Sequence, residues 1–179
     1  MEEIYVDAVG ADTTTTTETT AKQNKRKLKV MVAIDESKNS FYALEWAVEH
    51  LKDVMSAEPE TGQEGGLLTL VHVNPSGATG SVPELMKKAG VQSTNLFTPA
   101  LELCRAKMVK TETMILDGDP KEMICQAVEQ THTDLLVVGS RGLGMIKRAF
   151  LGSVSDHCVQ HAECPVLIVR LPRDTTTGK

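Results

Sequence analysis

The sequence is poor in aromatic residues and has no segment of the kind that crosses a membrane. Aromatic side chains make up 3% of its 179 residues, so a core has to be built from Val, Ile, Leu, Met and Ala. The first ten residues, MEEIYVDAVG, carry three acids and lack the apolar centre of a secretory signal. No apolar run reaches the length that a bilayer requires. These absences predict a protein of the cytoplasm without a membrane partner.

Cysteine patterns typical of zinc ribbons and disulfide scaffolds are also missing. The four cysteines are Cys104, Cys125, Cys158 and Cys164. No two of them are spaced C-x-x-C, and the chain is long enough to form a core without disulfides. His157 and His161 have the i, i+4 spacing of metal ligands, but no third ligand accompanies them. We therefore expect reduced thiols and no metal site.

The charge balance disfavours nucleic acid as a partner. The formal net charge is -5, whereas binding driven by phosphate electrostatics calls for a basic protein. The short basic run KQNKRK at 22–27 is either a nuclear-import signal or, more simply, a solvated spacer. We expect no nucleic-acid partner and leave a nuclear location open beside the cytoplasmic one.

Composition divides the chain into three parts. Residues 1–27 include the low-complexity run TTTTTETT and are predicted to be a disordered extension. Residues 173–179, RDTTTGK, are predicted to be a flexible tail. The intervening residues 28–172 hold the apolar runs and are predicted to form a single domain.

Short apolar runs alternate with helical patterns through this domain. Buried strands are predicted at 29–34, 67–73, 111–116, 134–140 and 165–171. Helices are predicted at 40–51, 95–110, 119–130 and 153–162. Asp119, Pro120 and Glu122 supply the N-cap, first-turn proline and N3 acid of the third helix. Residues 74–92, rich in Gly, Pro and Ser, are predicted to be a long loop.

Five strands separated by helices predict an α/β fold with a doubly wound, five-stranded parallel sheet sandwiched by helices. Ligands of such sheets bind beyond the carboxyl ends of the strands, where the strand order reverses. Two of these ends carry suggestive residues: Asp35 follows the first strand and Gly139 ends the fourth. Asp35 could bind a ribose hydroxyl, hold Mg²⁺ or cap the turn before the first helix.

The stretch GSRGLGMIKRAFLGS, residues 139–153, matches neither common phosphate loop. A P-loop needs Lys followed by Ser or Thr, and the dinucleotide fingerprint fails because Lys147 replaces its last glycine. The spacing that is present is Gly139-x2-Gly142-x9-Gly152-Ser153. It leads into a helix whose free N–H groups suit a phosphate. The alternative is a loop in which Ser153 only caps that helix, and spacing alone does not separate the two.

Three segments of the chain resemble the universal stress protein family. They are KVMVAIDES, ILDGDPKEMICQAV and VVGSRGLGMIKRAFLGSVSDHCVQHAECPVLIVR. The glycine spacing is that of the ATP-binding branch, and the SRGLG form is most similar to single-domain plant members. The resemblance implies a Rossmann-like, adenine nucleotide alpha hydrolase-like fold.

The resemblance also implies which residues contact a nucleotide. The glycine loop and the start of the last helix would hold phosphates, and the end of the fourth strand would lie beside the nucleotide. The end of the first strand would contact the adenosine, and the end of the second would flank the base. The implied nucleotide-binding residues are Ala33, Ile34, Asp35, Val73, Val138, Gly139, Gly142, Gly152, Ser153, Val154 and Ser155.

The predicted function is binding of ATP or AMP as a signal in stress response, with Mg²⁺ as a companion of the phosphates. The sequence shows no nucleophile activated by a base, so we expect no catalytic residues and at most slow hydrolysis. The alternatives are a chaperone-like interaction module and a true nucleotide hydrolase. The resemblance further implies a homodimer through the last strand, larger assemblies among plant members, and a protein partner that the sequence does not name. The strand residues concerned are Val166, Leu167, Ile168 and Val169.

Overall fold

A computed structural model describes residues 27–55, 65–75, 82–142 and 151–172. The predictions of a disordered extension and a flexible tail fall almost wholly outside these residues. The middle of the glycine stretch, residues 143–150, also lies outside them.

The described residues form five strands and four helices in strict alternation. The elements are β1 (Lys29–Ala33), α1 (Lys38–Met55), β2 (Leu67–Pro75), α2 (Val82–Ala106), β3 (Thr111–Gly118), α3 (Pro120–Thr131), β4 (Leu135–Gly139), α4 (Ser153–His161) and β5 (Val166–Val169). All strands are parallel, in the order β3-β2-β1-β4-β5. The prediction of a five-stranded, doubly wound α/β fold is confirmed.

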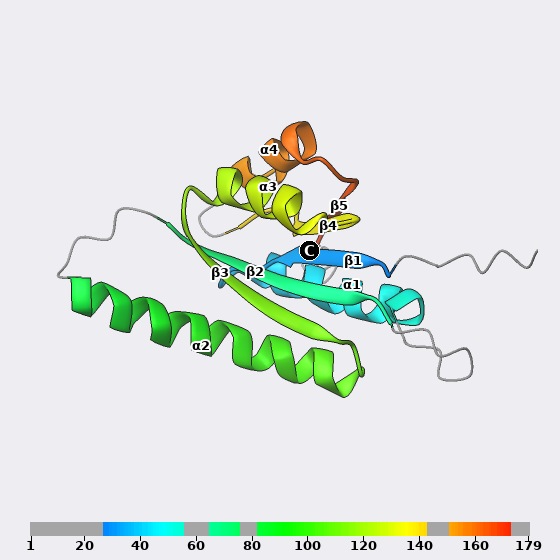
Figure 1. Cartoon of the computed structure of the whole chain (residues 1–179), viewed down its shortest axis with the longest axis horizontal. Helices are drawn as coiled ribbons and strands as arrows, with labels where there is room; N and C mark the ends of the chain where they lie inside the picture. The colour runs from blue at the N-terminus through cyan, green and yellow to red at the C-terminus, as the bar shows by residue number, and fades with distance from the viewer. Residues whose placement is uncertain (1–26, 56–64, 76–81, 143–150, 173–179) are drawn as a thin grey trace, which may run out of the picture.

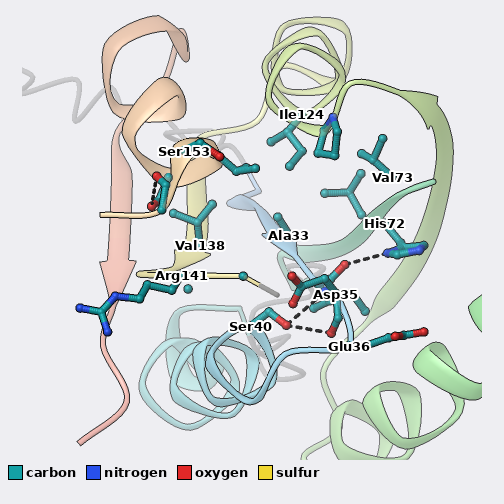
Figure 2. Close-up of a pocket in the computed structure, with 18 of the residues that line it drawn as sticks. Ala33, Asp35, Glu36, Ser40, His72, Val73, Ile124, Val138, Arg141 and Ser153 are labelled. Carbon is teal, nitrogen blue, oxygen red and sulfur yellow. Dashed lines mark hydrogen bonds between the residues drawn. The ribbon is translucent and has the colours of Figure 1, made fainter. Parts of the chain in front are cut away.

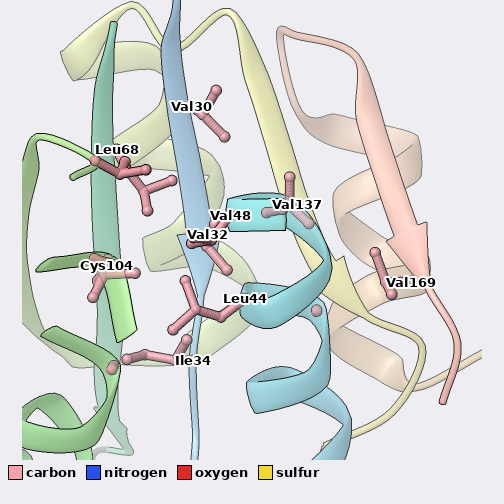
Figure 3. Packing of buried hydrophobic residues seen from close by; sticks show 14 of the residues in the cluster. Val30, Val32, Ile34, Leu44, Val48, Leu68, Cys104, Val137 and Val169 are labelled. Atoms are coloured by element: carbon pink, nitrogen blue, oxygen red, sulfur yellow. The ribbon is translucent and has the colours of Figure 1, made fainter. Parts of the chain in front are cut away.

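The helices cover both faces of the sheet and create two cores. Figure 1 shows α3 and α4 on one face, with α1 and α2 on the other. Successive residues of β1 alternate between these faces, so Val30 and Val32 pack toward α1 while Met31 packs toward α3. Figure 3 shows the first core, where Val30, Val32 and Leu44 meet. Each such fully buried aliphatic side chain contributes roughly 1.5–3 kcal/mol to folding.

The predicted loop at 74–92 is wrong in most of its length. β2 runs on to Pro75, and α2 begins at Val82 rather than at residue 95. The helix contains Gly90, which falls in the predicted loop, and Pro99, which falls in the predicted helix. Buried residues farther along α2 explain why the helix forms despite them. These are Leu96, Phe97, Ala100 and Cys104, which bury one stripe of α2 in the first core.

The strand order places a crevice at the carboxyl ends of β1 and β4. From β1 the chain moves to β2 and then β3 on one side, and afterwards to β4 and β5 on the other. The connections after β1 and β4 therefore leave in opposite directions. Parallel sheets of this type have their ligand sites at such a reversal.

Candidate functional site

A cavity of about 540 Å³ opens at this crevice. That volume lies within the range of small-molecule sites, about 300–1,000 Å³. All the residues for which the sequence predicted nucleotide contact line it (Figure 2). They are Ala33, Ile34, Asp35, Val73, Val138, Gly139, Gly142, Gly152, Ser153, Val154 and Ser155. The structure thus brings together residues that are up to 122 positions apart, from 33 to 155.

Sequence reasoning missed several other residues of the lining. They are Glu36, Ser40, Val71, Asn74, Pro75, Pro120, Ile124 and Arg141, while His72 was weighed only as a core or pocket residue. Pro120 and Ile124 belong to α3, whose start reaches the cavity beside that of α4. The helix-start signature at Asp119 could have found them, because every helix after a parallel strand begins at the carboxyl edge of the sheet.

Asp35 is both a cap and a cavity residue. Its Oδ1 accepts hydrogen bonds from the backbone N–H of Ser37, at 2.9 Å, and from the Ser37 hydroxyl. Its Oδ2 lies toward Gly142, where an added Cβ would come within 2.6 Å of that oxygen. Capping and ligand contact were predicted as alternatives, but the two oxygens point to different partners. One oxygen fixes the turn into α1 and the other faces the glycine segment.

The turn that carries Asp35 is fixed on its other side by two serines. The Ser40 hydroxyl donates to the backbone oxygen of Asp35 at 2.9 Å, and the Ser37 hydroxyl accepts from Ser40 N–H at 3.2 Å. Both serines are buried. The start of α1 therefore holds the Asp35 carboxylate in one place at the cavity mouth.

Gly139 is required by packing between β4 and α1. A Cβ on it would lie 2.8–2.9 Å from backbone atoms of Asn39 and Ser40. Such distances are shorter than real Cβ contacts and involve backbone, which cannot rotate away. The close approach that requires a glycine at the end of β4 is therefore that of the first turn of α1.

Helix α4 begins at the cavity without a side-chain cap. Its N-cap is Gly152, with φ -69° and ψ 155°, and Ser153 is the first helical residue. The prediction that Ser153 caps the helix is wrong. The nearby Ser155 hydroxyl donates to Gly152 O, at 2.9 Å, instead of accepting from an N–H group.

The first intrahelical bond of α4 runs from Asp156 N–H to Gly152 O at 2.8 Å. The N–H groups of Ser153, Val154 and Ser155 precede it and have no carbonyl partner within the helix. Together with the helix dipole they give this end of α4 a partial positive charge. An anion entering the cavity would meet backbone donors here.

The opposite wall of the cavity is apolar and is closed by a histidine. Ala33, Val73 and Val138 line it from three neighbouring strands. The Nδ1–H of His72 donates to the backbone oxygen of Ile34 at 2.9 Å, and its ring stands edge-on to Phe97. An apolar slot between strand ends suits a flat aromatic base, with backbone groups at its rim.

Charged residues at the mouth are of both signs. Asp35 and Glu36 lie at the end of β1, and Arg141 lies across the opening in the same lining. Figure 2 shows the Arg141 side chain extending away from Asp35. Among the described residues, no group of three or more His, Cys, Asp or Glu side chains is placed to hold a metal ion.

The helix-start prediction for α3 is confirmed. The Asp119 side chain accepts from Lys121 N–H at 3.2 Å, and Pro120 opens the helix. Glu122 has a further contact, because its Oε1 lies 3.6 Å from His157 Nε2 on α4. Helices α3 and α4 thus meet beside the cavity through polar as well as apolar contacts.

Comparison with known proteins identifies relatives over most of the chain. The model of the "Universal stress protein family" matches residues 28–170. A universal stress protein A-like protein of Arabidopsis thaliana is 49% identical over 73 residues, which are 41% of this chain and 42% of that protein. Universal stress protein PHOS34 of the same plant is 32% identical over 164 residues, 82% of this chain. The chain spans 63% of the length of PHOS34.

A solved structure is similar in both sequence and fold. It is a universal stress protein family protein from Arabidopsis thaliana with AMP bound. It shares 32% identity and a TM-score of 0.58, over 83% of this chain and 95% of that one.

In the described part of this chain no helix is long and apolar enough to cross a membrane.

Proposed function

Because the chain belongs to the universal stress protein family, we propose that its cavity binds an adenine nucleotide. The phosphate lies at the start of α4 and the base lies between the carboxyl ends of β1 and β2. The single observation that carries the proposal is the uncapped first turn of α4, which opens directly into the cavity. The AMP bound by the Arabidopsis relative supports the same class of ligand.

The two ends of the cavity match the two ends of a nucleotide. Backbone N–H groups of Ser153, Val154 and Ser155 suit phosphate oxygens, as helix starts do in other phosphate sites. The apolar wall formed by Ala33 and Val73 suits the purine. Asp35 Oδ2, at the mouth between them, suits a ribose hydroxyl.

The nucleotide acts as a bound signal in a stress response. The ligand is ATP or AMP, and Mg²⁺ accompanies the longer phosphate chain of ATP. Hydrolysis is at most slow, because the described residues of the lining include no base placed beside a nucleophile. The protein works in the cytoplasm. It forms a homodimer through β5, whose side chains are only partly buried in one copy except at Val169.

Two substitutions at one position test the phosphate site. Ser153→Pro removes a backbone N–H at the first helical position, where proline is well tolerated. Gly152 already has the extended backbone that a residue before proline adopts. Ser153→Ala is the matched control, since it removes the hydroxyl and keeps the N–H.

Titration calorimetry of nucleotide-free protein with AMP provides the measurement. Wild type should bind, and Ser153→Pro should bind about tenfold more weakly, because a hydrogen bond to a charged group contributes about 1.5–3 kcal/mol. Ser153→Ala should be affected less. Equal affinities for all three proteins would show that the start of α4 does not hold the phosphate. Absence of heat with wild type would favour the interaction-module alternative.

A further inference from the structure

Three of the four cysteines gather in the core behind the cavity. Cys158 on α4 is fully buried, and Cys125 on α3 and Cys164 before β5 are partly buried against the same cluster. Cys104 lies on the other face of the sheet, in the first core. All four are free thiols in this structure.

Cys125 and Cys158 occupy equivalent places on neighbouring helices. Cys125 lies five positions after Pro120, and Cys158 lies five positions after Ser153; both starting residues line the cavity. Five residues correspond to about 7.5 Å along a helix axis, so both thiols lie at the same depth. Both side chains pack in the same apolar cluster between the sheet and these two helices, close enough for each thiol to influence the pKa of the other.

The two thiols differ in their tendency to ionise. Burial, reinforced by the neighbouring Cys125, raises the pKa of Cys158 to about 12. Burial also raises the pKa of Cys125, and the proximity of Cys158 partly offsets that rise. Cys125 is the more exposed of the two. An exchange reaction with a small disulfide therefore begins at Cys125.

We propose that Cys125 and Cys158 form a reversible disulfide by exchange with a low-molecular-weight disulfide such as oxidised glutathione. The Cys125 thiolate attacks one glutathione sulfur, which forms a mixed disulfide and releases one glutathione thiolate. Cys158 then loses its proton and attacks the Cys125 sulfur, which forms the internal disulfide and releases the second glutathione. The two protein thiols are oxidised and one glutathione disulfide is reduced to two thiols. The two protons leave with the glutathione.

The disulfide acts on the cavity through the residues beside it. Ile124, next to Cys125, and Val154, one turn before Cys158, both line the cavity. A covalent sulfur–sulfur bond, at about 2.05 Å, is shorter than any contact between two unbonded thiols, so its formation draws α3 toward α4. This movement changes the spacing of the helix starts that the phosphate contacts. The effect on affinity rests on the proposed function, whereas disulfide formation does not.

Intact-mass measurement after incubation of the reduced full-length protein with oxidised glutathione tests the bond. We expect the loss of two hydrogen atoms and a peptide that joins Cys125 to Cys158. Cys125→Ser and Cys158→Ala should each abolish this product, while Cys104→Ser and Cys164→Ser should retain it. Circular dichroism confirms that each variant is folded; if Cys158→Ala is not, Cys125→Ser decides alone.

Only glutathione adducts, or a bond between Cys125 and Cys164, would overturn the proposal. A second measurement compares AMP binding to the oxidised and reduced protein. We expect the oxidised form to bind about tenfold more weakly, a change of about 1.4 kcal/mol. A disulfide that forms without changing the affinity would overturn only its coupling to the cavity. If neither form binds AMP, the proposed function fails while the mass result still stands.

Discussion

Asp35 depends on Gly142 for the space that its carboxylate occupies. Its Oδ1 is held by Ser37, and Oδ2 faces the position where a side chain at 142 would begin. The carboxylate cannot turn aside without giving up its bonds to Ser37. The absence of a side chain at Gly142 thus leaves room for the Asp35 carboxylate, and it also leaves room for a ligand.

Gly142→Ala should weaken AMP binding about tenfold by displacing Oδ2, while the free energy of unfolding changes by about 1 kcal/mol or less. Calorimetry of Gly142→Ala, Asp35→Ala and the double variant tests whether the effect passes through Asp35. The second substitution should then add little to the first, as expected for coupled residues. Fully additive losses would contradict this account.

Gly139 and Gly90 provide a matched pair for the free energy of unfolding. A methyl group at 139 would strike the backbone of α1, whereas one at 90 would meet nothing within 4 Å. Gly139→Ala should destabilise the protein by about 1–3 kcal/mol. Gly90→Ala should stabilise it by up to about 1 kcal/mol, because alanine favours the helix. Urea denaturation of the two variants checks both, and a stable Gly139→Ala would refute the close approach of β4 and α1.

At the residue scale, the sequence predicted which residues line the cavity better than it predicted what each of them does there. The glycine spacing and the acid after the first strand pointed to the cavity, and the full set of predicted contact residues came from the family resemblance; all of that set lines the cavity, but other lining residues were missed. The separate duties of the two Asp35 oxygens could not be predicted, because they depend on Ser37 and on a glycine that is 107 positions away in sequence (142 minus 35). Ser153 was misassigned because Gly152 already has the extended backbone of an N-cap.

Helices α3 and α4 act together as one wall of the cavity. Ile124 and Val128 of α3 and Cys158 of α4 belong to one buried cluster. Glu122 of α3 also approaches His157 of α4. Burial keeps the Cys158 thiol neutral within this wall, and its pKa is about 12 against an ordinary value of 9.0. The packing of the two helices is therefore linked to the proton on this sulfur.

Stability should fall at alkaline pH because of Cys158. The folded protein holds the thiol proton more tightly than the unfolded chain does, so the contribution is complete below pH 9.0 and is lost as the pH rises toward about 12. The loss approaches about 1.4 kcal/mol for each pH unit across that interval. Urea denaturation of wild type and Cys158→Ala at several alkaline pH values isolates the effect. If the free energy of unfolding falls equally steeply with pH in wild type and Cys158→Ala, Cys158 is not the cause of the loss.

Element boundaries were predictable where a cap or an apolar run marks them. The start of α3 was predicted because Asp119 and Pro120 have strong positional preferences. The start of α2 was missed by about one dozen residues, because composition suggested a loop while the buried stripe from Leu96 to Cys104 stabilises a long helix. Tertiary packing of this kind does not appear in local composition.

At the scale of the whole molecule, the two edges of the sheet differ. β3 alternates half-buried and exposed residues, while β5 is uniformly apolar and mostly half-buried. Its side chains pack on both cores of one copy. A second copy paired along β5 would bury the remaining apolar surface, which is the basis of the proposed dimer.

Ile168→Lys should therefore shift the protein from dimer to monomer. A charge in the paired edge opposes its own copy across the two-fold axis. Val159→Lys on the outer side of α4 is the control, since that residue is already 52% exposed. Sedimentation equilibrium gives the mass of each variant. A wild type that is monomeric at every concentration would refute the dimer.

The architecture as a whole followed from the order of apolar runs and helix patterns, because a parallel sheet requires a helical crossover after each strand. The strand order itself did not follow from those runs. It is defined by which strand edges pair, β1 with β4 and β4 with β5, and it decides that the acid after β1 meets the glycine segment after β4. The cavity is a product of that order.

The most direct test of the nucleotide proposal is a crystal structure of this protein with AMP. The account predicts phosphate oxygens within about 3 Å of backbone nitrogens in the first turn of α4, between Ser153 and Ser155. It also predicts the base between the ends of β1 and β2. An AMP molecule bound elsewhere, with its phosphate remote from that first turn, would contradict the account.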